Sequence, residues 1–178
     1  MKRLPPFLAI SSLLLLAFQC EKPYAGPDID FGPGEGITYR DAQGRPNGPQ
    51  DPSDWTTDAT WNEQELTYFN FPAFPVNGPQ QVAAVRAVGA YPNPGPAGQL
   101  TWRLKLSPTA PCPCQVYASL RSKRYTETDV FVATLAAGDS VQFAPKAYDT
   151  GQLYRLYYVL SAANSLLYKG HGDIRFTP

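Results

Sequence analysis

Apolar and polar side chains alternate along several short stretches in the second half of the chain. Over residues 100–106 every even-numbered residue is Leu or Trp, and every odd-numbered residue is Thr, Arg or Lys. A period of two places successive side chains on opposite faces of a strand, so this stretch predicts a strand with one buried face. Similar alternation occurs in residues 116–121, 154–160 and 166–176.

Three further segments complete the predicted strands. Residues 130–135 form a nearly continuous apolar run, residues 141–143 follow a glycine turn, and residues 82–90 fit either a strand or a helix. About seven short strands, with turns between them and no alternation of strand and helix, favour a sandwich. We therefore expect an all-β, antiparallel β-sandwich domain over residues 80–178.

The stretch before this domain is rich in proline and glycine. Residues 21–98 contain 12 of the 19 prolines and 10 of the 14 glycines. This composition is typical of extended spacers, so residues 20–50 are expected to form a flexible tether. Residues 51–79 are expected to be partly ordered, with a short helix that starts at a capping box of Thr60 and Glu63.

The first residues have the order of a secretory signal. Lys2 and Arg3 precede an apolar run over residues 7–18. That run is shorter than the ~20 apolar residues that a membrane-spanning helix needs. Residues 1–19 are therefore predicted to be a signal peptide.

Cys20 follows the apolar run directly, and charge begins at Glu21. This arrangement resembles the lipobox of bacterial lipoproteins. The resemblance implies a diacylglyceryl and N-acyl lipid on Cys20, which would become the new N-terminus. Ala17 and Gln19 stand where that family usually has Leu and a small residue. The alternative is an ordinary secretory signal that is cleaved nearby.

The tetrapeptide Tyr91-Pro92-Asn93-Pro94 precedes the strand predicted over residues 100–106. Both prolines fix φ near −65° and asparagine tolerates turn conformations, so the tetrapeptide predicts a rigid corner. It resembles the opening of the C-terminal sorting domains of type IX secretion. That resemblance implies an Ig-like β-sandwich that runs to the chain terminus. The central Asp-x-x-Gly-Arg-like hairpin of that family has no counterpart here.

Charge and composition narrow the classes of function. The chain has 15 basic and 15 acidic residues, and no basic stripe. We therefore expect no nucleic-acid partner. The only histidine is His171, and neither a nucleophile elbow nor a zinc-protease motif accompanies it. An enzyme, a metal site and a cofactor other than the lipid are not expected.

The most polar strand segment runs from Lys169 to Asp173. His171 and Asp173 share one strand face at i, i+2 spacing, and we expect that face to be exposed to solvent. A binding site there is the alternative. Gly170 and Gly172 predict a bulge or the close approach of another segment.

Cys112 and Cys114 flank a proline. In an oxidising compartment two such thiols are expected to form a disulfide across a small ring. Zinc is the alternative, but it needs two more ligands than this motif supplies.

Tyr117 and Tyr157 fall on strand parities that predict solvent exposure. Exposed aromatic rings on a sandwich can bind a glycan or a protein. The alternative is a tyrosine-rich surface that packs against the N-terminal segment.

Together these features predict a non-catalytic lipoprotein of the cell envelope, at the outer membrane. Both the periplasmic face and the surface face of that membrane remain open. The lipid would hold it to the membrane, and the β-sandwich would bind an unidentified envelope protein or glycan. Two alternatives remain: a type IX secretion sorting or adaptor module, and a carbohydrate-binding module.

Overall fold

The computed structural model of the chain describes residues 27–69, 74–146 and 149–178. The predicted signal peptide and Cys20 lie outside these residues. Within them, no helix is long and apolar enough to cross a membrane.

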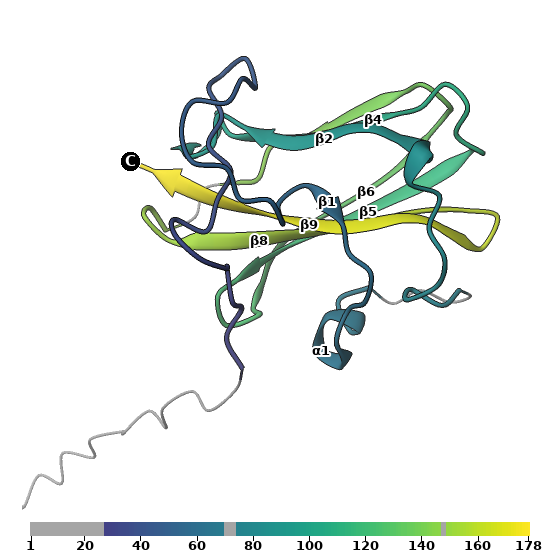
Figure 1. The fold of residues 1–178 in the computed structure, drawn as a ribbon, viewed down its shortest axis with the longest axis horizontal. Coiled ribbons are helices and arrows are strands. Elements are labelled where there is room, and N and C mark those ends of the chain that lie inside the picture. The colour runs from purple at the N-terminus through teal and green to yellow at the C-terminus, as the bar shows by residue number, and fades with distance from the viewer. Residues whose placement is uncertain (1–26, 70–73, 147–148) are drawn as a thin grey trace, which may run out of the picture.

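The chain forms two β-sheets packed face to face, so the all-β sandwich predicted from the sequence is confirmed (Figure 1). The larger sheet has the order β1-β9-β8-β5-β6, and β3 also pairs with β9. Its strands are β1 (Thr56–Thr57), β3 (Gly95–Pro96), β5 (Cys114–Ser122), β6 (Glu127–Leu135), β8 (Leu153–Ala162) and β9 (Ser165–Thr177). The smaller sheet has the order β2-β4-β7, formed by β2 (Val85–Tyr91), β4 (Thr101–Leu106) and β7 (Ser140–Phe143).

Seven of these nine strands coincide with the segments predicted from apolar patterning. The two additional strands, β1 and β3, are two residues long and carry too little sequence to show a period. Every pairing is antiparallel except the parallel pairing of β3 with β9. Residues 82–90 contain both predicted forms, because a 3₁₀ turn at Val82–Ala84 precedes β2.

The main core lies between the two sheets. The alternating apolar residues of β4 point into it, and Trp102 is fully buried against Tyr158 of β8 and Phe131 of β6. At the β8–β9 hairpin, Ala163 and Asn164 both have positive φ, which is the backbone geometry of a tight two-residue turn. The predicted half-buried strands therefore supply one face each to a shared core.

A second apolar cluster covers the outer face of the larger sheet. Its members come from β8 and β9 and from the N-terminal segment, which we define as residues 27–69 and 74–81. They are Ile29, Phe31, Trp61, Tyr68, Tyr157, Val159 and Leu166. In Figure 1 the first described residues of this segment and its short helix α1 (Glu63–Leu66) lie on the side of β8 and β9 that faces away from β2 and β4.

The prediction of a flexible tether over residues 20–50 is wrong for residues 27–50. Ile29 and Ile37 are buried, at 2% and 1% exposure, and the Ile29 amide donates to the Lys123 carbonyl. Apolar side chains lie between the prolines of this stretch and give it apolar surface to bury. The high content of proline and glycine alone does not reveal them. The sandwich also does not begin at residue 80, because β1 pairs with β9.

The short helix in residues 51–79 is present, but its cap is not at Thr60. Asn62 accepts a hydrogen bond from the Glu65 amide, and the Glu65 carboxylate accepts one from the Asn62 amide. Asparagine caps a helix as well as threonine does, so the same motif two residues later forms the capping box.

Candidate functional site

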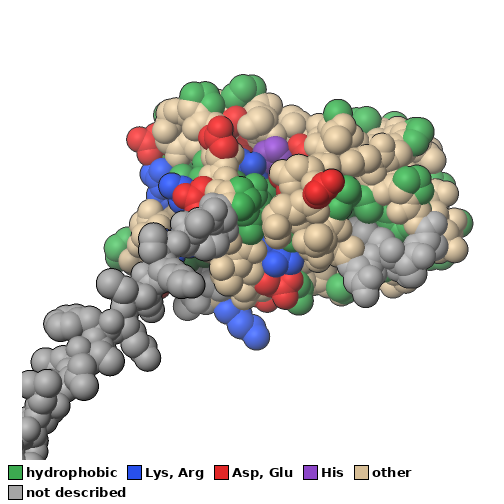
Figure 2. Space-filling view, turned by 90° about the horizontal axis from the view of Figure 1, so that it is seen from below, with side chains coloured by type: hydrophobic (Ala, Val, Ile, Leu, Met, Phe, Trp, Pro, Cys, Tyr) green, Lys and Arg blue, Asp and Glu red, His purple; other side chains and the backbone are tan. Residues whose placement is uncertain are grey.

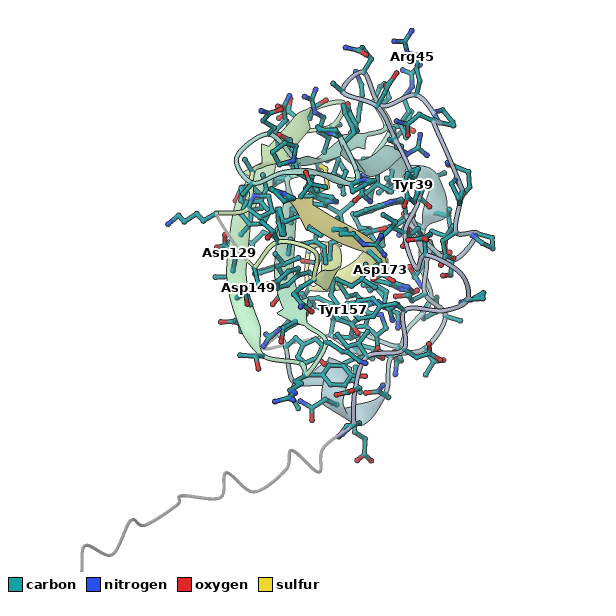
Figure 3. All side chains as sticks on the ribbon, turned by 90° about the vertical axis from the view of Figure 1, so that its left-hand side faces the viewer. Tyr39, Arg45, Asp129, Asp149, Tyr157 and Asp173 are labelled. Atoms are coloured by element: carbon teal, nitrogen blue, oxygen red, sulfur yellow. A yellow bond between two sulfur atoms is a disulfide. The ribbon has the colours of Figure 1, made fainter. Side chains whose placement is uncertain are left out.

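The polar face of β9 was predicted to be exposed, and this prediction is wrong. Asp173 is fully buried and forms a two-pronged ion pair with Arg155, with both N–O distances at 2.7 Å. The N-terminal segment covers this face: the Arg155 guanidinium also donates to the Asp30 carbonyl, and the Asp173 amide donates to Asp54. In Figure 3 Asp173 lies inside the outline of the molecule, whereas Arg45 stands at a loop tip.

His171 does not pair with Asp173. Its Nδ1 lies 2.8 Å and 2.9 Å from the two carboxylate oxygens of Asp58, which also accepts a hydrogen bond from the Trp61 indole. Within the described residues, no hydroxyl or thiol is hydrogen-bonded to His171, so the pair lacks the nucleophile that a catalytic triad requires. These contacts fasten the N-terminal segment to β9.

Further polar contacts serve the same function. The Lys169 ammonium is buried and donates to Asn77, and its desolvation lowers its pKa. The Tyr157 hydroxyl donates to Glu65 at 3.0 Å, and burial raises its pKa. Figure 2 views this covered face, where acidic and basic side chains lie close together on the surface.

Asp54 lies at the centre of the covered polar layer. It is 5% exposed and accepts hydrogen bonds from the amides of Thr38 and Asp173, both at 2.7 Å. Desolvation and the nearby Asp173 carboxylate raise its pKa to about 7. Asp54 therefore binds a proton over a pH range in which an exposed aspartate would not.

The two candidate binding tyrosines differ in their surroundings. Tyr157 is fully buried between Trp61 and Tyr68, so its predicted exposure is wrong and the alternative, packing against the N-terminal segment, holds. Tyr117 is partly exposed and lines a small apolar hollow of about 220 Å³ beside Val130 and Val132.

Cys112 and Cys114 are joined by a disulfide. Cys114 is the first residue of β5, and Cys112 lies two residues before it. Cys114 is fully buried in the main core. In the described part of the chain, no group of three or more His, Cys, Asp or Glu side chains is placed to hold a metal ion.

The tetrapeptide Tyr91-Pro92-Asn93-Pro94 forms the predicted corner at the end of β2. Asn93 is fully buried, and its amide nitrogen donates to the carbonyls of Thr38 and Asp173. Its amide oxygen accepts from the Arg175 amide. Its backbone forms two further hydrogen bonds with Arg40. The corner therefore fixes the position of Arg40 relative to the smaller sheet.

The outer face of the smaller sheet carries a cleft of about 460 Å³. Cross-strand pairing places Gly89, Arg103 and Gln142 in one row across β2, β4 and β7. The next row contains Ala87, Lys105 and Ser140. Three of the four flanking residues, Gly89, Ala87 and Ser140, are much smaller than the cationic side chains on the central strand.

The loop over residues 40–44 forms one wall of this cleft. In Figure 1 the chain that follows residue 40 rises beside one end of β2 and β4. Gly44 approaches Tyr91 so closely that a Cβ on it would lie 3.2 Å from the ring. The Arg103 guanidinium lies over the same ring, 4.5 Å from its centre. Tyr91 therefore holds Arg103 in place by a cation–π contact.

The cleft is positively charged. Arg40, Arg103 and Lys105 line it, and no Asp or Glu does. None of the three cations has an ion-pair partner among the described residues. The Nε atoms of Arg40 and Arg103 are buried without a hydrogen-bond partner there. Guanidinium groups that line an open cleft and have no ion-pair partner favour a bound oxyanion.

The sequence pattern indicated only the part of this site that lies on β4. Arg103 and Lys105 alternate with the core residues of β4, so their shared outward face was readable, although strand cations usually mark an ordinary solvated face. Arg40 is 63 residues from Arg103 in the chain, and no local pattern connects them. The buried role of Asn93, which brings Arg40 to β2, likewise has no signal in the sequence.

No protein-family model matches the chain, and no curated protein matches its sequence.

Proposed function

We propose that this protein is a non-catalytic lipoprotein of the cell envelope, held at the outer membrane by a lipid on Cys20. Its β-sandwich binds a protein partner through the open outer face of β2, β4 and β7. The membrane attachment rests on the sequence of residues 1–21 and its resemblance to the lipobox. The choice of face rests on the structure.

The observation that supports the binding face is the difference between the two sheets. The N-terminal segment covers the outer face of the larger sheet and supplies polar partners to its side chains, such as Lys169 and His171. The outer face of the smaller sheet keeps three cations that are not neutralised. A folded protein gains nothing in stability from such a cluster, so an external partner of opposite charge is the simplest reason for it.

Binding is favoured over catalysis by the residues that line the cleft. They include no His, Cys, Asp or Glu, so the usual general bases and the strongest nucleophiles are absent from the lining. His171 lies on the opposite sheet, where it pairs with Asp58 of the N-terminal segment.

The membrane attachment is tested by Cys20→Ser. We expect the wild-type chain to fractionate with membranes and to incorporate labelled fatty acid. We expect the variant to lose the label and to be released. A variant that stays in the membrane fraction without label would contradict the lipid anchor.

The binding face is tested by a photo-reactive amino acid placed at Gln142, which is exposed at the rim of the cleft. In intact cells we expect one specific adduct from position 142. The control probe at Ser165 lies at the tip of the β8–β9 hairpin, away from the cleft, and should give none. Equal adducts from both positions, or none from either, would argue against this face.

A second candidate function, a type IX sorting or adaptor module, is favoured by one observation. The corner at Tyr91–Pro94 meets the end of the chain, because β3 pairs with β9 at Gly95 and Phe176. Recovery of a surface or secreted form trimmed near Tyr91 would support it. Such trimming would separate β2 from β4, with which it pairs.

The alternative of carbohydrate binding lacks an open aromatic platform in the cleft. Gly44 and Arg103 both lie against the Tyr91 ring, which leaves it poorly placed to stack on a sugar.

A further inference from the structure

We infer that the basic cleft on the smaller sheet binds an extended acidic peptide, with one carboxylate held between Arg40 and Arg103 and a second at Lys105. This inference rests on the proposed function, in that it takes the open face of β2, β4 and β7 as the binding face. It adds the chemical class of the partner.

The first carboxylate position is defined by two guanidinium groups. Gly89 lies opposite Arg103 in the adjacent strand, and a Cβ built on Gly89 would lie 3.9 Å from the Arg40 Nε. The Arg40 Nε therefore lies above Gly89, which has no side chain of its own, and Arg103 occupies the paired position on β4. A carboxylate accepts two parallel N–H bonds from a guanidinium fork, and these charge-assisted bonds are roughly twice as strong as neutral ones.

Both arginines are held in place before any ligand binds. One Nη of Arg40 donates to the Gly44 carbonyl at 2.9 Å, and the Arg40 backbone is paired with Asn93. Arg103 lies over the Tyr91 ring. Side chains already held in their bound geometry lose less conformational entropy on binding, so this arrangement favours a specific site over a diffuse charged surface.

The spacing of the cations favours a peptide over other polyanions. Arg103 and Lys105 are two residues apart on one strand, so their Cα atoms are separated by about 6.5–7 Å. Alternate residues of a bound extended peptide have the same separation. A sequence with acidic residues at every second position would therefore place successive carboxylates over Arg103 and Lys105.

The test measures binding of the purified mature chain carrying Cys20→Ser to a short, capped, fluorescent peptide of alternating glutamate and threonine, by fluorescence anisotropy. We expect binding that weakens as salt is added, because exposed charges are screened. Arg103→Gln should weaken binding about tenfold or more, the loss of one charge-assisted contact. Arg103→Lys keeps the charge but not the guanidinium fork, so its affinity should lie between those of the wild type and Arg103→Gln.

The matched control is Arg86→Gln. Arg86 is exposed on β2 but does not line the cleft, so this variant has the same net charge as Arg103→Gln. We expect less than about a twofold effect from it, since only long-range attraction is lost. Equal losses in both variants would overturn the site and leave only non-specific attraction. Circular dichroism of each variant checks that the fold is retained.

Four further probes separate the ligand classes. A peptide of the same composition with its glutamates adjacent should bind several-fold more weakly, and the glutamine version should not bind. If polygalacturonate or inorganic phosphate binds with the same dependence on Arg103 and the alternating peptide does not, the cleft binds a different anion and the peptide inference is wrong. If no probe binds, the inference is also wrong.

These outcomes are distinguishable from failure of the proposed function. A specific adduct from Gln142 in cells, together with no binding of acidic peptides, would keep the binding face and reject its chemistry. Release by Cys20→Ser is independent of both results.

Discussion

At the scale of single residues, the buried amide of Asn93 has the largest consequences. It joins Thr38 of the N-terminal segment, Asp173 and Arg175 of β9 and, through its backbone, Arg40. A buried amide whose donors and acceptor are all used fixes the relative positions of the segments it joins. The second of the two prolines in the corner follows it directly and restricts the backbone further.

Asn93→Ala should destabilise the protein by about 2–4 kcal/mol, because two carbonyls and one amide in a buried site lose their partner. Urea denaturation followed by tryptophan fluorescence measures this change. Asn47→Ala is the control: Asn47 is exposed, and we expect a change within about 0.5 kcal/mol. Similar values for the two variants would contradict the structural role of Asn93.

Asp54 predicts a dependence of stability on pH. Its pKa in the folded protein is about 7, above the ordinary value of 3.8. Between these values the folded chain holds a proton that the unfolded chain releases, so the free energy of unfolding should fall as the pH rises from about 4 to about 7. Asp54→Asn removes the titrating carboxyl group, so we expect the free energy of unfolding to depend less on pH in that range. Parallel profiles for the two proteins would show that Asp54 does not titrate there.

At the scale of elements, β9 is the strand on which most contacts converge. It pairs with β1, β3 and β8, and its two glycines allow the N-terminal segment to come close. A Cβ on Gly170 would overlap the Thr56 carbonyl, and one on Gly172 would overlap the Trp55 ring. The sequence predicted either a bulge or the close approach of another segment at these glycines, and the structure shows the close approach.

Gly172→Ala should destabilise the protein by about 3 kcal/mol, because the new methyl group forces the Trp55 ring out of its place. Gly89→Ala is the matched control in β2, where the new methyl group meets nothing nearer than 3.9 Å. Since alanine restricts the unfolded chain more than glycine, we expect Gly89→Ala to be neutral or to stabilise by about 0.5 kcal/mol. Thermal unfolding of both variants measures the contrast, which an equal loss would contradict.

At the scale of the whole molecule, the N-terminal segment is part of the folded unit. It supplies the outer half of the second apolar cluster and the partners of Arg155, Lys169 and His171. Its removal would expose Tyr157 and Val159 and leave buried charged groups without their partners. Both changes lower stability, the first through lost apolar burial and the second through unpaired charge.

We therefore expect residues 80–178 alone to unfold with low cooperativity and to bind a hydrophobic dye, whereas the chain from residue 21 should unfold in one transition. Calorimetry and dye fluorescence of the two proteins measure this difference. A cooperative fragment of equal stability would show that the N-terminal segment is only an attached arm.

The sequence by itself determined the strands and the sandwich. Alternation over residues 100–106 and 154–160 depends only on which side chains avoid water, and that preference acts locally along a strand. It also indicated the Cys112–Cys114 pair, because two residues so close in the chain need no fold to meet. The export signal and the lipid on Cys20 stay predictions from the sequence, since they lie outside the described residues.

Only the tertiary structure decided which polar faces are open. The odd-numbered face of β9 and the odd-numbered face of β4 look alike in sequence, with charged residues at every second position. The first is covered because Asp54, Asp58 and Asn77, which are distant in the chain, form hydrogen bonds with its backbone and side chains. The second is left open, and Arg40 joins its cations through Asn93. Periodicity specifies a strand's faces, but the cover on each face depends on contacts between residues far apart in the chain, which no local pattern records.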